Sequence, residues 1–591
     1  MRRRLPCLSA ANRLLSDILA INAAPAKTLR AGQRDRFAPR SAGQHNRITT
    51  KWNEAMRWKR PTLLLLSAGT IAAAPMAEPV YDVQGKGIAA VASDLRSGKV
   101  TAQALVQAYV SRIAAMDRTG PALHTIVALN PDIAREAAAS DARRRSGAAA
   151  RPLEGIPILI KDNIETADAM PTTAGSLALA DNITRRDSPL VAKLRAAGAL
   201  ILGKTNLSEW ANFRASRSIS GWSGVGGLTR NPFALDRSPC GSSSGSAAAV
   251  AASLAPAAIG TETDGSITCP ASMTGLVGLK PTVGLVSRSH VVPISSSQDT
   301  PGAITRDVAD AALITTVIAG TDPADPATVE ADQHPINAAA VHDPGALRGR
   351  RIGVARFLVG HNAPTDAVFA RALQTLRDAG ATLVELPDGP DMDAIGAAEM
   401  TVLLTEFKAD LDSYLATTPP AVQARSLAAV IGFNTAHAAR ELGLFGQDLM
   451  LKAQATAGLD DPGYKASRAL SLRLAGAEGI DRLMTQNHLD AMVAPTGGPA
   501  WVVDLVNGDH DGGSAAPLPA VAGTPHLTVP MGDVDGLPVG LSFIGPAWSE
   551  QRLLGYGYAF ETRAKVAPRP LYLPALPLTA AQQALLAPRS P

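Results

Sequence analysis

From about residue 78 onward, stretches with a helical period alternate with short runs of apolar residues. Thr101 is placed to cap a helix whose apolar positions recur every four residues, so one face of this segment is apolar. Residues 156–160 form a mostly β-branched run directly after a glycine, which predicts a buried strand ending at Lys161. This alternation of helices and strands predicts an α/β fold.

The alternation continues towards the C-terminus. It predicts helices at 188–198 and 365–380, and strands at 199–202, 352–355, 382–386 and 489–494. Residues 387–480 are mostly helical in period, and we expect them to form an addition placed over the sheet. No internal repeat, long polar linker or seam interrupts the chain, so we predict one large domain over residues 78–591.

Composition and charge exclude several classes of protein. With 46% hydrophobic and 18% charged residues the chain is not intrinsically disordered, and three cysteines cannot staple 591 residues into a disulfide scaffold. Residues 1–60 hold fourteen Lys and Arg against three Asp and Glu, so the formal net charge of +4 divides into +11 for this segment and −7 for the rest. The body of the protein therefore lacks the basic footprint of a nucleic-acid-binding protein, and we expect no nucleic-acid partner.

The basic N-terminus leads into an export-like segment. Met56 starts a short charged stretch, residues 61–74 are apolar but too short to span a bilayer, and small residues follow up to Ala77. We predict a signal peptide at 56–77, with residues 1–55 a non-native upstream extension or a disordered arm. A basic arm without a signal, or a single membrane anchor, stays open as an alternative. The favoured interpretation predicts a periplasmic or secreted protein with no stable membrane span after signal removal.

The most unusual segment is rich in glycine and serine. Residues 238–246 combine four serines after a Pro-Cys-Gly step, and the small-residue helix 247–254 follows. The five residues 241–245 also fit the G-x-S-x-G elbow of α/β-hydrolases, but that elbow requires a preceding buried strand, which 230–239 does not provide. Further on, Ser266 follows a short apolar run and an Asp-Gly turn, a position suited to present its hydroxyl beside free backbone N–H groups.

Several spaced motifs resemble those of the amidase signature family. They occur in the family's order, at 155–163, 203–209, 238–246, 265–267, 278–282 and 536–540. The resemblance implies a single large α/β/α domain with a mixed central sheet. It also implies a serine hydrolase of carboxamide C–N bonds, an amidase without cofactor or metal. In this family Ser266 would be the nucleophile, Ser242 a bridging serine in a cis peptide, and Lys161 the base.

The chemistry of these residues agrees with that assignment. A serine hydroxyl is a weak nucleophile until a base takes its proton. A lysine with its ordinary pKa of about 10.4 is neutral only about once in two thousand at pH 7, so Lys161 must be desolvated, and the end of an apolar strand favours this. The backbone N–H groups of Thr263, Asp264, Gly265 and Ser266 are predicted to form the oxyanion hole. We expect the carboxylate of Asp264 to point outwards, away from the developing charge.

Some departures from the commonest family pattern point to a subgroup. Cys240, Glu262 and Asp264 replace more usual residues, and this variant resembles bacterial peptide amidases, which release ammonia from the C-terminal carboxamide of peptides. The partner would then be a small-molecule or peptide amide, and we expect a monomer. Two alternatives stay open: an A-type component of a transfer-RNA-dependent amidotransferase, which needs partner subunits in the cytoplasm, and a non-catalytic binding protein on the same fold.

Other possible sites are weaker. Cys240 and Cys269 flank the predicted site and could be buried thiols or a disulfide. His526 is expected to be a loop or core histidine, and residues 507–512 look like a calcium loop but lack its ligand positions, so we predict a turn. Pocket residues are expected from 387–480 and 496–520.

Overall fold

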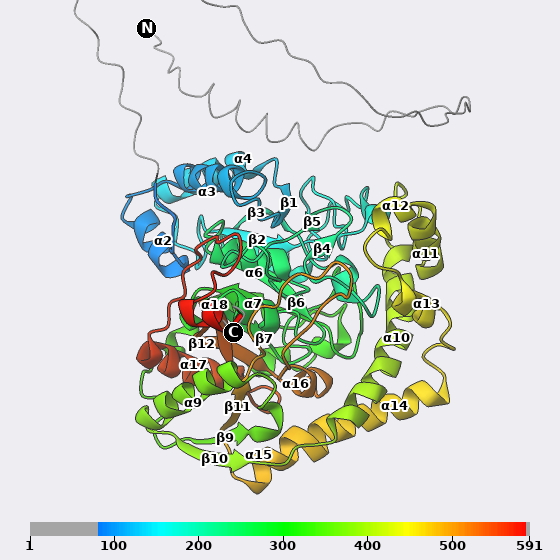
Figure 1. Ribbon diagram of the computed structural model, residues 1–591. Helices are drawn as coiled ribbons and strands as arrows, with labels where there is room; N and C mark the ends of the chain where they lie inside the picture. Colours follow the sequence, from blue (N-terminus) through cyan, green and yellow to red (C-terminus); the bar gives the residue numbers. More distant parts are fainter. Residues whose placement is uncertain (1–80, 587–591) are drawn as a thin grey trace, which may run out of the picture. The chain divides into compact units, whose positions relative to one another are not determined.

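The computed structural model describes residues 81–586, and the predicted extension at 1–55 and signal peptide at 56–77 lie outside them. The described residues form one unit built on an eleven-stranded mixed sheet (Figure 1). In spatial order the strands are β1 (Ile126–Leu129), β3 (Leu200–Thr205), β2 (Pro157–Lys161), β6 (Ala257–Glu262), β8 (Thr300–Thr305), β7 (Val277–Lys280), β12 (His526–Val534), β13 (Leu537–Ile544), β11 (Ala491–Pro495), β9 (Arg351–Ala355) and β10 (Thr382–Leu386).

Parallel and antiparallel pairs alternate in blocks across this sheet. β3, β2 and β6 run parallel to one another, as do β11, β9 and β10, while the pairs between these blocks are antiparallel. Every residue of β2, β3, β6 and β8 is buried, which is typical of strands covered by other elements on both faces. The α/β architecture with a mixed central sheet is therefore confirmed.

Helices flank the sheet and agree with the periodicity of the sequence. The α-helices that precede β10 in the chain are α2 (Ile88–Arg96), α3 (Ala102–Met116), α4 (Ile133–Arg145), α5 (Pro189–Ala196), α6 (Ser244–Ala251), α7 (Thr268–Met273), α8 (Val308–Ile318) and α9 (Ala363–Asp378). Thr101 caps α3 as predicted, because its hydroxyl accepts a hydrogen bond from the N–H of Ala104 at 3.1 Å. The strand predicted at 156–160 is β2, and Lys161 is its last residue.

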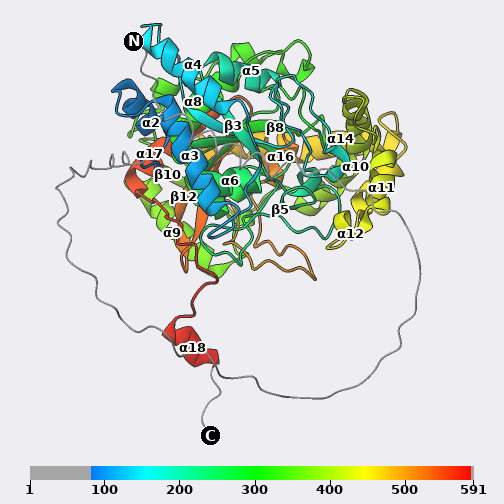
Figure 2. The same cartoon turned by 90° about the horizontal axis from the view of Figure 1, so that it is seen from above.

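The segment 387–480 is helical, as its sequence indicates. It holds α10 (Met392–Ala416), α11 (Leu427–Ala436), α12 (Ala438–Glu441), α13 (Asp448–Gln454) and α14 (Pro462–Leu472), and α14 continues through a π-helical stretch into α15 (Arg482–Gln486). α10, α11 and α13 share a buried apolar cluster with the connections around residues 174–179 and 210–213. Both views place α10 to α13 on the opposite side of this unit from α2, α9 and α17 (Glu550–Ala564) (Figures 1 and 2).

The remaining described elements are short. They are α16 (Pro517–Val521), α18 (Ala580–Leu586), a separate two-stranded sheet of β4 (Trp222–Ser223) and β5 (Gly227–Leu228), and 3₁₀ helices at Leu177–Leu179, Glu209–Asn212, Pro326–Thr328, Ala331–Gln333, Ala338–Val341 and Arg356–Leu358. Among residues 81–586, no helix is both long and apolar enough to cross a bilayer.

Candidate active site

The candidate site lies where three neighbouring strands begin or end. β2 and β6 run parallel, with Ile160 opposite Ile259, so their C-terminal ends meet at the same edge of the sheet. β8 runs antiparallel to β6, with Thr300 opposite Glu262, so β8 begins at that edge. The register therefore brings Lys161, the residues after β6 and the residues before β8 together, although they are far apart in the sequence.

Lys161 is fully buried at the end of β2. Its Nζ lies 2.7 Å from Oγ of Ser242, 2.8 Å from Oγ1 of Thr261 and 3.1 Å from the carbonyl oxygen of Thr261. These partners are two hydroxyls and a carbonyl, and none is a carboxylate. Burial lowers the pKa of Lys161 to about 7, while the charges of Asp299 and Glu262 oppose that lowering. A lysine in this environment is neutral in a large fraction of molecules at neutral pH.

Ser242 belongs to the connection that leads into α6. The peptide bond between Gly241 and Ser242 is cis, as the family resemblance implies. The carbonyl of Ser242 accepts a hydrogen bond from the N–H of Ser208 at 3.1 Å, and the next N–H, that of Ser243, donates to the carbonyl of Ser266 at 3.1 Å. The last contact holds the connection carrying Ser242 against the turn that carries Ser266.

Ser266 follows β6 on a tight turn and is 7% exposed. The turn requires a glycine, because Gly265 has a φ of +78°, which other residues rarely adopt. Glu262, the last residue of β6, accepts hydrogen bonds from the N–H groups of Ile267 at 2.7 Å and Thr268 at 2.8 Å. This carboxylate therefore fixes the turn from strand to α7. In the sequence Glu262 stands out only as a replacement in a family motif.

The backbone N–H groups predicted to form an oxyanion hole are free within the described part of the chain. Those of residues 263–266 donate to no backbone or side-chain acceptor there, while the next two are held by Glu262. Asp264 is half-buried, and the direction predicted for its side chain stays a prediction. Burial and the charge of Glu399 raise the pKa of Asp264 well above its usual range, which favours the neutral acid beside these N–H groups.

The chain matches the family model for amidases over residues 104–554. It is 35% identical over 527 residues to a probable amidase from Arabidopsis thaliana, covering 86% of this chain and 97% of that protein. The chain belongs to the amidase family. Two further similarities concern particular members. The structure of native peptide amidase from Stenotrophomonas maltophilia is 52% identical, with a TM-score of 0.78, over 83% of this chain and 99% of that one. The A-type component of a glutamyl-tRNA(Gln) amidotransferase from Chloroflexus aggregans is 37% identical over 80% of this chain and 95% of that protein.

Family membership identifies this chain as an amide hydrolase, and a disulfide lies at its candidate active site. Cys240 and Cys269 form a disulfide with their Cα atoms 6.0 Å apart, which answers the question that the sequence left open. It joins the connection that carries Ser242 to the helix that follows Ser266. The two segments that carry Ser242 and Ser266 are thus linked covalently.

The surroundings of the amidase site agree in part with the expected pocket segments. Gln298 donates through Nε2 to Glu399 of α10 at 2.7 Å and to the carbonyl of Thr263 at 3.4 Å, so it links α10 to the turn before Ser266. The Cβ of Ala516 lies 3.4 Å from the position that a Cβ on Gly265 would occupy. Segments 387–480 and 496–520 therefore both approach the site.

Two other predictions concern His526 and residues 507–512. His526 is fully buried in β12, and Nε2 lies 2.5 Å from Oγ of Ser542, so it is a core histidine as predicted. Residues 507–512 form a connection, and within residues 81–586 no cluster of three His, Cys, Asp or Glu side chains is arranged to hold a metal ion.

Proposed function

We propose that this amidase hydrolyses the C-terminal carboxamide of peptides and releases ammonia by a Ser-cisSer-Lys mechanism. The observation that carries the mechanism is the contact between the fully buried amine of Lys161 and Ser242, next to the turn that presents Ser266. The 52% identity to a peptide amidase supports the choice of substrate.

The mechanism starts from neutral Lys161. The lysine takes the proton of Ser242, which takes the proton of Ser266, while Oγ of Ser266 bonds to the amide carbon. The carbonyl oxygen gains a negative charge, and the N–H groups of residues 263–266 stabilise it. The proton then returns from the lysine through Ser242 to the amide nitrogen, the C–N bond breaks, and ammonia leaves. Water attacks the resulting ester in the same manner and frees Ser266.

The experiment that tests this proposal compares Ser266→Ala with Ser97→Ala. Ser97 is an exposed serine after α2 and serves as the matched control. Ammonia release would be measured on a panel of peptide amides, free amino-acid amides and acyl amides. We expect Ser97→Ala to keep full activity and Ser266→Ala to lose it without a change in the circular dichroism spectrum. Retained activity in Ser266→Ala would remove this serine from the mechanism.

The same panel separates the proposed substrate from the amidotransferase alternative. Peptide amides should be cleaved with the highest kcat/KM by the isolated chain. If the chain released ammonia only from glutamine, and only when partner subunits were added, the result would favour an amidotransferase component instead.

We further propose that the enzyme is exported and acts as a monomer. Export is supported by the segment at 56–77, and the disulfide between Cys240 and Cys269 suits an oxidising compartment. N-terminal sequencing of protein recovered from the periplasm or the medium should find a start near residue 78. Intact chain beginning at Met1 in the cytoplasm would contradict export, and light scattering would test the monomer.

A further inference from the structure

Asp299 lies directly across the sheet edge from the turn that carries the nucleophile. The last ladder pair of β6 and β8 is Glu262 with Thr300, so the next step along the antiparallel pair places Thr263 beside Asp299. Oγ1 of Thr263 donates a hydrogen bond to Oδ1 of Asp299 at 2.5 Å. Asp299 is 9% exposed. A buried carboxylate therefore holds one of the residues whose free N–H group is assigned to the proposed oxyanion hole.

The other oxygen of this carboxylate binds the connection before β8. Oδ2 of Asp299 accepts hydrogen bonds from the N–H groups of Ile294 at 2.8 Å and Ser295 at 3.0 Å. One alternative is that Asp299 only fastens this connection, as buried carboxylates often do at turns.

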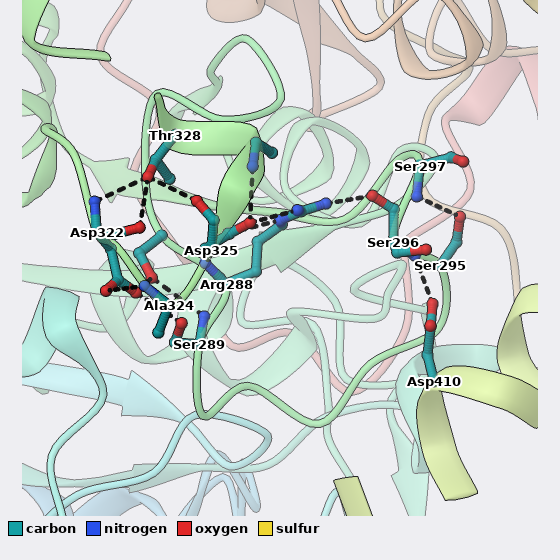
Figure 3. Close-up of polar contacts among 12 residues, drawn as sticks. Arg288, Ser289, Ser295, Ser296, Ser297, Asp322, Ala324, Asp325, Thr328 and Asp410 are labelled. Carbon is teal, nitrogen blue, oxygen red and sulfur yellow. Dashed lines mark hydrogen bonds and ion pairs between the residues drawn. The ribbon is translucent and has the colours of Figure 1, made fainter. Parts of the chain in front are cut away.

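Other polar contacts, which Figure 3 shows, also hold that connection in place. The guanidinium of Arg288 binds Asp325 through Nη2 at 2.6 Å and Nε at 2.9 Å, and the N–H of Ser296 donates to Asp410 at 2.7 Å (Figure 3). The connection is thus tied to two other parts of the chain. The bond to Thr263 is what distinguishes Asp299 from these anchors.

Asp299 also lies near enough to Lys161 for its charge to act on the amine. Thr261, Thr263 and Asp299 line one cavity of about 10 Å³, and Thr261 is the residue that Lys161 contacts on this side. The charge of Asp299 is the largest influence that raises the pKa of Lys161 against the effect of burial.

The other charged groups around Lys161 are bound to partners of their own. Glu262 also raises the pKa of Lys161, but its carboxylate binds the N–H groups at the start of α7. Asp162 and Lys204 form an ion pair at 3.6 Å, so their opposite charges offset each other. Burial raises the pKa of Asp299, and the positive charge of Arg288 opposes this rise.

We propose that Asp299 is a positioning residue of the amidase reaction, which fixes Thr263 beside the nucleophile and places a negative charge opposite Lys161. This inference rests on the proposed function. It assigns two separable effects to one carboxylate. The hydrogen bond to Thr263 orients an oxyanion donor and acts on kcat, whereas the charge sets the pH at which Lys161 becomes a base.

The test compares three variants by the pH dependence of kcat/KM and by kcat at the plateau. Asp299→Asn removes the charge that favours the lysine's ammonium form, so we expect the acidic limb to move to lower pH by roughly one unit, with kcat lowered about tenfold. Thr263→Val keeps the charge and loses the hydroxyl, so we expect a similar fall in kcat with the limb unmoved. Asp325→Asn, which loosens the same connection at Arg288, is the matched control and should leave the limb in place.

The outcomes are decisive in either direction. Suppose that the acidic limb of kcat/KM stays at the wild-type pH in Asp299→Asn, and that Thr263→Val has the kcat of the wild type. Asp299 would then only hold the connection in place, and the inference would be wrong. If Asp299→Asn does not fold, Thr263→Val decides alone, because unchanged kcat overturns the positioning role. Failure of the proposed function would show differently, as activity retained in Ser266→Ala whatever happens at Asp299.

Discussion

Lys161 and Lys204 are two fully buried lysines on neighbouring parallel strands, and their surroundings differ in one respect. Lys204 of β3 lies 3.6 Å from a carboxylate oxygen of Asp162 and donates to the carbonyl of Ile164 at 2.7 Å and to Oγ1 of Thr172 at 2.8 Å. Lys161 of β2 has only hydroxyl and carbonyl partners. Burial lowers the pKa of both lysines, and at Lys204 the charge of Asp162, a direct partner, opposes this lowering.

Burial alone therefore does not make a lysine a base. Asp162 follows Lys161 directly in the sequence, but consecutive residues of an extended segment point to opposite faces, so its carboxylate serves Lys204 instead. A buried lysine with a carboxylate keeps its charge and acts structurally. A buried lysine with hydroxyl partners loses its proton easily and can pass it to them.

The largest expected effect is on activity, in Lys161→Met. Removing the base should lower kcat/KM for ammonia release by about 10⁴-fold, as in other hydrolases that lose a member of the catalytic group. Since no carboxylate contacts this lysine, the variant should unfold at the same or a higher temperature than the wild type. Activity within tenfold of the wild type would show that Lys161 is a structural lysine like Lys204.

Lys204→Met should have the opposite profile. It leaves the carboxylate of Asp162 buried without its partner, which we expect to lower the free energy of unfolding by about 3–5 kcal/mol in denaturant titrations. The folded fraction should keep a kcat within a few-fold of the wild type. Adding Asp162→Asn should recover part of the lost stability. A loss of kcat without a loss of stability would contradict the division of roles.

The smallest effects are expected from the hydroxyl partners of the two lysines. Thr261→Val removes an acceptor of Lys161 and of Asn163, so it should lower kcat by about tenfold and cost about 1 kcal/mol of stability. Thr172→Val removes the corresponding acceptor of Lys204 and should cost about 1 kcal/mol of stability while kcat stays unchanged. Equal effects of both substitutions on kcat would mean that the two lysine environments are not functionally distinct.

Local sequence patterns predicted those parts of the structure that depend on neighbouring residues. The apolar run before Lys161 placed this lysine at the end of a strand, and Thr101 marked the start of α3. The family motifs placed Ser242 and Ser266 in connections that the structure brings together. The predictions for residues 1–77 lie outside the described residues and stay predictions.

Features that depend on strand order and register could not be read from the sequence. Asp299 meets Thr263 only because β8 pairs with β6 antiparallel, and no local pattern determines that pairing. The pairing of Cys240 with Cys269 likewise depends on how two connections approach each other in space. The partner of Asp162 required the position of β3 beside β2.

The pH dependence of kcat/KM for ammonia release from a peptide amide reports directly on whether Lys161 acts as the base. Lys161 must be neutral to accept a proton, and its pKa is lowered to about 7. Activity should therefore rise with pH through about 7 and level off above about 8. A rate that keeps rising until about pH 10, where an ordinary lysine loses its proton, would contradict the account.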